Sequence, residues 1–293
     1  MKKEEASSTA FTVAQGTLHC ARRPDLAGLV PKDVKEALMT ILSASPEGRK
    51  RLKQLDSAIF NTLAPLAEKL LMPGITIHYV LRKRFIEDKV VEAVNSGVRQ
   101  VVSLGAGFDT LAFRLSSIYP DVRFLETDHP ATSKLKASAL LSQDNHRKNL
   151  AFLPIDFTCQ TLEEVVGNSG LFERELETLF ISEGVLMYLT DSQVRGMLCA
   201  MKNLSANRPK FIFTFVSPKA LEKHNSNLLL RIYLSFKSEP LLWKVEREEL
   251  KVFLEENDYR LLSTHSPVEF GKAYLPEGFA GQLHEGELIA LSA

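Results

Sequence analysis

From Gln100 to the C-terminus, short apolar segments alternate with segments of helical periodicity, and this alternation restricts the fold more than any other feature. Strands are expected at residues 100–104, 122–126, 150–154, 178–182, 210–216, 259–263 and 286–292. Helices are expected from about Asp109 and over residues 130–141, 161–166, 191–204, 219–230 and 246–256. Such alternation predicts βαβ units and a mostly parallel sheet, which makes this an α/β protein.

The first hundred or so residues instead have a helical pattern throughout. Helices are expected over Ser57 to Leu71 and Ile77 to Val94, with Pro73-Gly74 as the break between them. The first of these helices has apolar residues at helical spacing, namely Ile59, Leu63, Leu66 and Leu70. No Gly/Ser-rich linker divides the chain. We therefore predict one domain over residues 1–293, with a helical cap and lead-in helix at 1–98 and a core at 99–293 that has a substrate-side insertion around 219–245.

Composition argues against several classes of protein. The 36 basic and 36 acidic residues give a net charge of zero, without the basic excess of a nucleic-acid-binding protein. The N-terminal segment has no apolar stretch of the kind found in secretion signals, and the expected strands are too short to cross a bilayer. We expect a cytoplasmic protein without nucleic-acid or membrane partners. The three cysteines have no paired spacing, so we expect no disulfide framework and no metal site.

The sequence VVSLGAGFDT places Gly105 and Gly107 at the end of the first strand of the sheet. Ligands of parallel sheets bind at the carboxyl ends of the strands, and glycine allows a sharp turn and a close approach of the backbone. The dinucleotide fingerprint requires a third glycine three residues later, where Thr110 stands, and no Walker Lys follows. The turn disfavours a dinucleotide and leaves open another nucleoside cofactor, or a βα turn that has no ligand.

Acidic residues follow four successive strands. They are Asp109, Glu126 or Asp128, Asp156 and Glu183. An acid roughly 20 residues after the glycines is the residue type that binds ribose hydroxyls. Several carboxylates would repel an anionic pyrophosphate and attract a cationic sulfonium. The charge pattern therefore favours S-adenosylmethionine as the cofactor.

Several ordered blocks resemble one known family. The blocks are LRKRFIEDKV (81–90), VVSLGAGFDTLAFRL (101–115), ETDHP (126–130), EGVLMYL (183–189) and SEPLLWKVEREELKVFL (238–254). With these blocks the chain resembles the leucine carboxyl methyltransferase family of S-adenosylmethionine-dependent enzymes, which includes bacterial polyketide-type O-methyltransferases. The resemblance implies a Rossmann-like class I methyltransferase fold. In this fold a seven-stranded, mostly parallel sheet has an antiparallel last strand, and a helical cap covers the cofactor.

The resemblance also implies how the methionine end of the cofactor is bound. An arginine before the first strand binds the methionine carboxylate, and here it is Arg82 or Arg84, with Arg82 fitting the block better. A guanidinium suits this role because it pairs with a carboxylate through two parallel hydrogen bonds. Gly105 and Gly107 approach the methionine portion, and Glu183 closes the site near the amino group.

The adenosine end is implied in the same way. Asp128 matches the ribose-binding acid, and Glu126 supports it. Asp156 and the backbone of Phe157 flank the adenine, and Tyr188 is a candidate for the acceptor pocket.

The function expected from these residues is O-methylation of a carboxylate or hydroxyl on a small molecule or peptide end. Two alternatives stay open from the sequence: a non-catalytic, cofactor-binding regulator and a nicotinamide-dependent oxidoreductase. Thr110 in place of the third glycine argues against the oxidoreductase.

Overall fold

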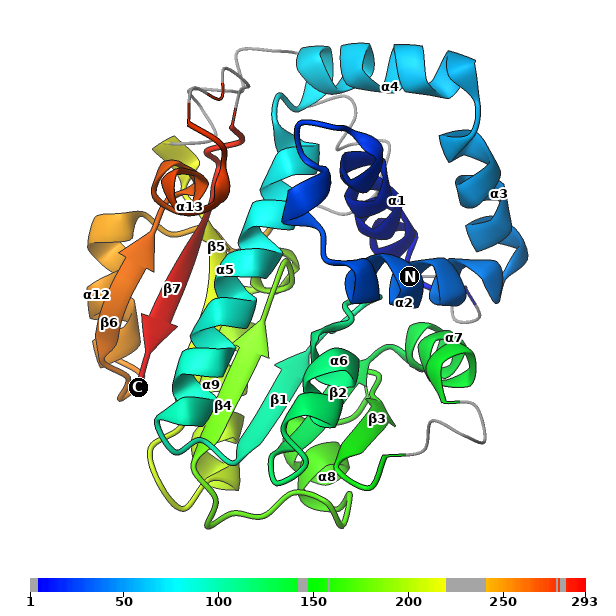
Figure 1. The fold of residues 1–293 in the computed structure, drawn as a ribbon. Helices are drawn as coiled ribbons and strands as arrows, with labels where there is room; N and C mark the ends of the chain where they lie inside the picture. Colours follow the sequence, from blue (N-terminus) through cyan, green and yellow to red (C-terminus); the bar gives the residue numbers. More distant parts are fainter. Residues whose placement is uncertain (1–4, 142–146, 158, 220–240, 278, 280–282) are drawn as a thin grey trace.

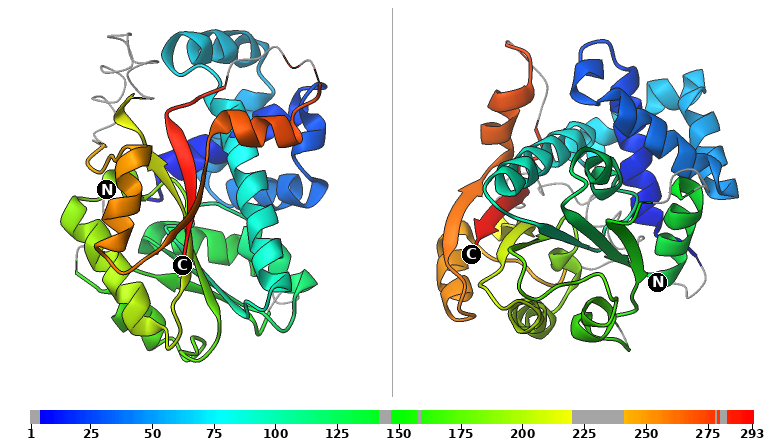
Figure 2. Two further views of the ribbon diagram at one scale, coloured as in Figure 1. Left: turned by 90° about the vertical axis from the view of Figure 1, so that its left-hand side faces the viewer. Right: turned by 60° about the horizontal axis from the view of Figure 1, so that its bottom comes forward.

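The structure is a computed structural model that describes residues 5–141, 147–157, 159–219, 241–277, 279 and 283–293. A seven-stranded sheet lies at its centre, with helices on both faces and a helical cap at one end (Figure 1). Two further views show the twist of the sheet and the helices that cover it (Figure 2). This architecture confirms the α/β class predicted from the alternating pattern.

The strands lie close to the predicted positions. They are β1 (Gln100–Leu104), β2 (Arg123–Asp128), β3 (Leu150–Pro154), β4 (Thr178–Ser182), β5 (Lys210–Val216), β6 (Leu261–His265) and β7 (Glu287–Ser292). Their order in the sheet is β3-β2-β1-β4-β5-β7-β6. β1 to β5 pair in parallel, whereas β7 runs antiparallel to both β5 and β6. The predicted mostly parallel sheet with an antiparallel last strand is confirmed.

The strand order creates a crevice beside β1. The chain moves outward from β1 to β2 and β3, and then returns to the other side of β1 with β4. Loops that leave the carboxyl ends of β1 and β4 therefore diverge, and such a reversal is where ligands bind in open α/β sheets.

Alternating side chains of the strands form two separate layers of core. In β5, Phe211, Phe213 and Phe215 pack in one layer while Ile212 packs in the other. Each fully buried side chain of this size contributes about 1.5–3 kcal/mol through the apolar surface that it removes from water. This alternation explains why β5 is apolar along its whole length, since both of its faces are buried.

Different helices cover the two faces. The layer that contains Ile212 is covered by α5 (Ile75–Asn95), α6 (Leu111–Ile118) and α13 (Pro267–Tyr274). The opposite layer is covered by α8 (Leu162–Gly167), α9 (Asp191–Leu204) and α12 (Arg247–Glu255). α7 (Pro130–Leu140) packs beside β3 at the edge of the sheet.

The cap consists of α1 (Ser8–Arg22), the short 3-10 helix η1 (Ala27–Leu29), α2 (Lys32–Ser43), α3 (Pro46–Leu55) and α4 (Ala58–Leu71). Phe11 of α1 packs edge-to-face on Phe108 of the glycine loop, with 4.9 Å between the ring centres. Ile41 and Leu42 of α2 complete this buried cluster. The cap therefore packs directly against the loop that follows β1.

The helix expected over Ser57 to Leu71 is confirmed as α4, and Gly74, with a φ of 75°, provides the expected break before α5. The four apolar positions of α4, however, do not face the core. Ile59, Leu63, Leu66 and Leu70 are between 52% and 72% exposed. Helical spacing predicted this helix correctly, but α4 lies at the outside of the cap (Figure 1), where its apolar residues are exposed.

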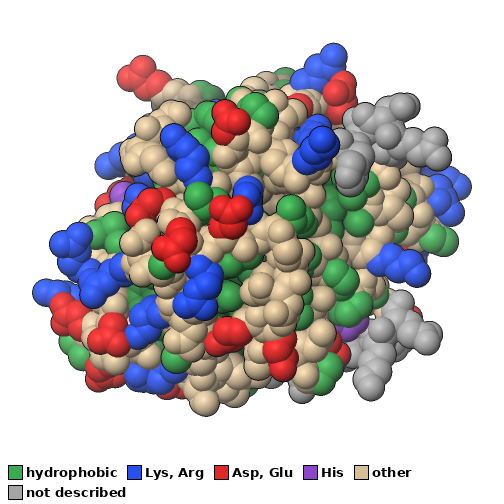
Figure 3. All heavy atoms as spheres, turned by 90° about the horizontal axis from the view of Figure 1, so that it is seen from below, with side chains coloured by type: hydrophobic (Ala, Val, Ile, Leu, Met, Phe, Trp, Pro, Cys, Tyr) green, Lys and Arg blue, Asp and Glu red, His purple; other side chains and the backbone are tan. Residues whose placement is uncertain are grey.

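The helix expected over residues 219–230 and most of the insertion expected around 219–245 lie outside the described residues. Among the described helices, none combines the length and the apolar content needed to cross a membrane. On the face shown in Figure 3, acidic and basic side chains are interspersed, and neither sign forms a stripe over its described residues.

Candidate active site

A large cavity lies at the carboxyl ends of the central strands, beneath the cap. Its volume is about 1,090 Å³, which is above the range of roughly 300–1,000 Å³ that small-ligand pockets usually have. The loops after β1, β2, β3 and β4 line it, together with parts of α1 and α5. A cavity of this size has room for a nucleoside cofactor and a second small molecule.

The glycine loop adopts a backbone conformation that other residues avoid. Gly105 and Gly107, which both line the cavity, have φ values of 68° and 52°. A Cβ atom on Gly105 would lie only 2.4 Å from Cγ2 of Val185. We expected glycine here to admit a ligand, but at Gly105 the protein's own Val185 occupies the space beside the missing side chain.

Asp128 lies at the end of β2 and faces the cavity. Its two carboxylate oxygens accept hydrogen bonds from the backbone N–H groups of Gly107, at 2.6 Å, and His129, at 2.7 Å. Burial raises the pKa of Asp128, and these two N–H donors, Lys136 and the Thr132 hydroxyl partly offset that effect. The Thr132 hydroxyl donates to the same carboxylate. Because a carboxylate can accept about four hydrogen bonds, Asp128 retains an acceptor position for a ribose hydroxyl.

Glu126, which the resemblance paired with Asp128, does not line the cavity. It is 3% exposed and forms a buried ion pair with Lys136 of α7. Burial raises the pKa of Glu126 to about 7, although Lys136 acts in the opposite direction. The structure therefore places Glu126 behind the site, where it has no direct route to a ligand in the cavity.

Asp156 and Phe157 follow β3 and line the cavity on the same side as Asp128. The Phe157 side chain is 37% exposed, which leaves a ring face available to a ligand. These positions agree with the predicted nucleoside end, and the individual roles stay predictions.

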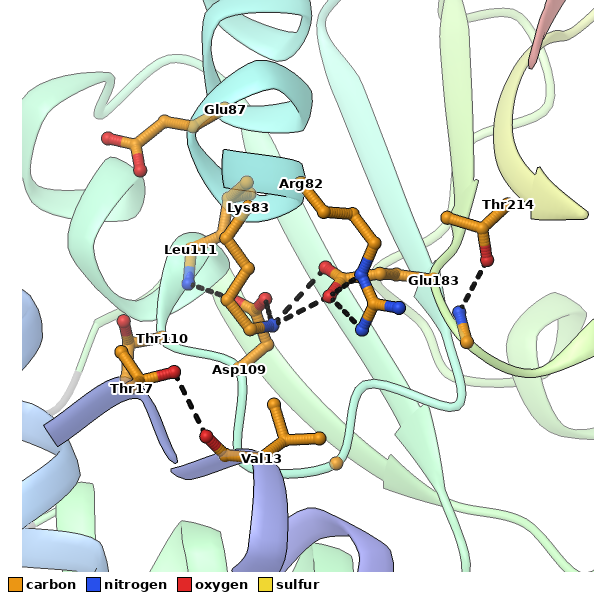
Figure 4. A network of polar contacts seen from close by, with 12 residues as sticks. Val13, Thr17, Arg82, Lys83, Glu87, Asp109, Thr110, Leu111, Glu183 and Thr214 are labelled. Atoms are coloured by element: carbon orange, nitrogen blue, oxygen red, sulfur yellow. Dashed lines mark hydrogen bonds and ion pairs between the residues drawn. The ribbon is translucent and has the colours of Figure 1, made fainter. Parts of the chain in front are cut away.

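A cluster of charged side chains also lines the cavity (Figure 4). Arg82 of α5, only 5% exposed, donates a hydrogen bond of 2.8 Å to Glu183 and another to Glu287 at the start of β7. The His78 ring lies 2.9 Å from the same Glu287 oxygen. Arg82 thus connects α5, the loop after β4 and β7.

The structure separates the two candidate arginines. Arg82 lines the cavity, whereas Arg84 does not and lies 5.9 Å from the ring of Tyr274 on α13. Residues two positions apart on a helix point in different directions, so only one of this pair can face the ligand. The geometry favours Arg82 for the predicted carboxylate contact.

Lys83 is a cavity residue that the sequence did not single out. Its ammonium pairs with Asp109 and, at 3.0 Å, with Glu183 (Figure 4). The sequence marks Asp109 as an acid after the first strand but assigns it no contact with the cofactor. Glu287 was missed as well, and the available signal was an acid at the start of an otherwise apolar strand.

The charged groups of this cluster hold one another in the ionised state. Burial alone would raise the pKa of Glu287 and of Asp109. The cation Arg82 and the His78 ring nevertheless bring the Glu287 pKa well below its usual range. Lys83 and Lys136 have the same effect on the Asp109 pKa. Burial likewise opposes the charge of Arg82, but Glu287 and Glu183 raise its pKa.

Tyr188, in the short 3-10 helix η3 (Leu186–Tyr188), lines the cavity as expected, and its part in acceptor binding stays a prediction. Within the described ranges, no group of three or more His, Cys, Asp or Glu side chains is arranged to hold a metal ion.

Comparison with known proteins gives consistent matches. The family model for leucine carboxyl methyltransferase matches residues 17–202. A Streptomyces coelicolor protein named as an S-adenosyl-L-methionine-dependent methyltransferase is 31% identical over 153 residues, which cover 51% of this chain and 52% of that protein. A Frankia alni protein with a name of the same kind is 34% identical over 134 residues, or 45% and 46% of the two chains. The match thus spans about half the length of these relatives.

A solved structure supports the fold. The crystal structure of a methyltransferase from Thermobifida fusca aligns with a TM-score of 0.53, covering 87% of this chain and 93% of that one. At 16% identity this likeness confirms the Rossmann-like fold and nothing finer.

We predict that Gly105→Ala destabilises the protein more than Gly170→Ala does. Both glycines have a φ near 69°, so both substitutions carry a backbone cost of about 1–2 kcal/mol. Only Gly105 adds a clash, because nothing lies within 4 Å of a Cβ placed on Gly170. Urea unfolding of the two variants checks this. Equal losses in the free energy of unfolding would contradict the prediction, because they would show that the Val185 side chain moves aside without destabilising the protein.

We also predict a pH-dependent effect of Glu126→Gln. Since the pKa of Glu126 is about 7 in the folded protein and 4.5 when unperturbed, its stabilising contribution is complete below pH 4.5. That contribution is lost as the pH rises through 7. Relative to the wild type, the variant should therefore gain roughly 1–3 kcal/mol between pH 5 and pH 8 in urea unfolding. A constant difference across this range would contradict the raised pKa.

Proposed function

Since the chain belongs to the leucine carboxyl methyltransferase family, we propose that it is an S-adenosylmethionine-dependent O-methyltransferase that acts on a small molecule or a peptide end. One observation carries the proposal most directly: Asp109, Asp128, Asp156 and Glu183, acids that follow four different strands, line a single cavity. The negative charges of these acids attract a nucleoside cofactor that has a cationic sulfur.

The charge of the whole cavity supports the same cofactor. Among the described lining residues there are two strong bases, Arg82 and Lys83, and six acids: Glu5, Asp109, Asp128, Asp156, Glu183 and Glu287. This excess of acids disfavours an anionic pyrophosphate and suits a ligand with a sulfonium and an ammonium group. The residues present therefore fit S-adenosylmethionine.

The proposed contacts divide between the nucleoside and the methionine part of the cofactor. Asp128 accepts a hydrogen bond from the ribose, while Asp156 and Phe157 flank the adenine. In the charged cluster, Arg82 binds the methionine carboxylate and Glu183 binds the amino group. Arg82 can serve in this way because a guanidinium has five N–H donors, and the contacts with Glu183 and Glu287 use only some of them.

When bound, S-adenosylmethionine supplies a methyl group that is already activated by the positive charge on sulfur. The protein's task is then mainly to align the acceptor with that methyl group, which is catalysis by positioning. α1 and the glycine loop line the site, and so does Tyr188, which follows β4. We propose Tyr188 as an acceptor-pocket residue on this basis.

Two alternatives have less support. A nicotinamide oxidoreductase needs the third glycine, and here the Thr110 hydroxyl accepts a hydrogen bond from Arg114 at 3.1 Å within the buried loop. A non-catalytic regulator would need room for the cofactor alone, whereas the cavity is larger than that. The cytoplasmic location expected from the sequence stays a prediction.

Calorimetry tests the cofactor directly. We expect S-adenosylmethionine and S-adenosylhomocysteine to bind and NAD not to bind. Binding of NAD, with no binding of either adenosyl ligand, would overturn the proposal.

We predict that Asp128→Ala weakens S-adenosylhomocysteine binding by roughly 10- to 100-fold, because a hydrogen bond to an ionised group is lost. The matched control is Asp121→Ala, which removes the same charge from an exposed position. Calorimetry measures the affinities and thermal unfolding verifies that both variants are folded. An unchanged affinity in folded Asp128→Ala would remove Asp128 from the ribose site.

A further inference from the structure

We propose that Lys136 is a positioning residue of the cofactor site and that it acts through Asp128. Its buried ammonium is the counter-charge that keeps Asp128 an anionic acceptor for the ribose, and Glu126 holds this ammonium in place instead of contacting the ligand. The inference rests on the proposed function, because it assigns Lys136 a role only if Asp128 binds a nucleoside. It follows from the way in which the end of β2 packs against α7.

The packing of β2 against α7 joins two pairs of side chains. Glu126 and Asp128 are two positions apart in β2, so they point to the same face of the sheet. Thr132 and Lys136 are four positions apart in α7, so they lie on the same face of the helix. The Thr132 hydroxyl donates to Asp128, and the Lys136 ammonium donates to Glu126. α7 thus directs a hydroxyl group and a cation toward the end of β2.

Lys136 is deeply buried for a lysine, a residue that is almost never fully buried unless its charge has a partner. It is 1% exposed, and Glu126 beside it is 3% exposed. Its ammonium also lies 5.7 Å from the centre of the Phe152 ring in β3, which is a favourable position for a cation. A buried ion pair adds little stability compared with well-packed apolar residues of similar volume. A role other than stability therefore explains this charge better, and Asp128 in the same strand as Glu126 provides one.

Asp128 benefits from a counter-charge because it is buried near other acids. Burial raises its pKa and so favours the neutral form, and Lys136 opposes this effect. Lys136 acts in the same direction on Asp109 and on Glu126. The charged and titratable groups that line the cavity with Asp128 or precede it in β2 are Glu126, Asp109 with its partner Lys83, Asp156 and His129. One buried ammonium thus acts on three acids that belong to or follow β1 and β2.

Glu126 neutralises this ammonium only in part at neutral pH. Because burial raises the pKa of Glu126 to about 7, roughly half of the Glu126 side chains carry a proton at that pH. The charge of Lys136 is then available to Asp128. An ionised Asp128 binds a ribose hydroxyl more strongly than a neutral one, since hydrogen bonds to charged groups are the stronger class.

Lys136→Met tests the role, because it removes the ammonium and keeps a long, unbranched side chain. The matched control is Lys134→Met, at an exposed position two residues away on α7. Without the ammonium, the pKa of Asp128 rises further, so its carboxyl group takes up a proton as the pH falls. We expect the S-adenosylhomocysteine affinity of Lys136→Met, divided by that of the wild type, to fall at least about tenfold from pH 8 to pH 5 in calorimetry. The same ratio for Lys134→Met should stay constant.

The pH profile separates this role from a purely structural one. A displacement of α7 would lower the affinity by the same factor at every pH, so a constant ratio in folded Lys136→Met would overturn the proposal. In an Asp128→Ala background, Lys136→Met should add no pH-dependent loss, because Lys136 acts through Asp128. A pH-dependent loss that persists in this background would equally contradict the role.

Glu126→Gln provides a second test, because it keeps the ammonium and removes only the acid that holds it. We expect its affinity at pH 5 to stay within about twofold of the wild type, since Glu126 is already protonated at that pH. An acid-side loss as large as that of Lys136→Met would show that the ammonium is not responsible.

Thermal unfolding verifies that Lys136→Met is folded. If it is not, Glu126→Gln combined with Lys136→Met takes its place, because this double variant leaves no charge buried without a partner. If the double variant also fails to fold, carboxyl carbon NMR of the wild type decides, with Asp128→Asn to assign the signal. An ionised Asp128 at pH 7 supports the proposal, and a protonated one overturns it.

The wild-type titration distinguishes failure of this inference from failure of the proposed function. If S-adenosylhomocysteine does not bind to the wild type, the proposed function fails. If it binds and the affinity ratio of Lys136→Met does not depend on pH, the proposed function stands and only the role of Lys136 is wrong.

Discussion

The ion pairs of Arg82 connect the parts of the protein that form the site. Arg82 belongs to α5, the helix that links the cap to the sheet, and it contacts Glu183 after β4 and Glu287 at the start of β7. Removing one partner from a buried pair typically costs about 3–5 kcal/mol, because the other charge is left uncompensated. The position of the cap over the cavity therefore depends on charges that also face the ligand.

This arrangement has a consequence for ligand choice. The charges of Arg82 and Lys83 are largely neutralised by Glu183, Glu287 and Asp109, so the cavity is acidic overall despite its two strong bases. An acidic, partly buried cavity favours a cationic cofactor over a pyrophosphate. This charge distribution is consistent with the proposed cofactor.

The candidate site was predictable from the sequence wherever a residue directly follows a strand. Gly105, Gly107, Asp128, Asp156 and Glu183 all line the cavity, since the carboxyl ends of parallel strands share one edge of a sheet. Predictions that depended on side-chain direction were less secure. Glu126 is only two residues from Asp128, yet it lies behind the cavity, paired with Lys136 of α7.

By itself, the sequence determined the strands, most of the helices and the family. Periodicity, turn residues and short motifs are local features, and each indicates the structure of the segment in which it occurs. Only the tertiary structure decided which of Arg82 and Arg84 faces the cavity, that α4 exposes its apolar side, and that Glu287 joins a site nearly two hundred residues away from Asp109. These outcomes depend on how elements distant in the sequence pack together. A pattern of residue types contains the spacing within each element but not the orientation of one element against another.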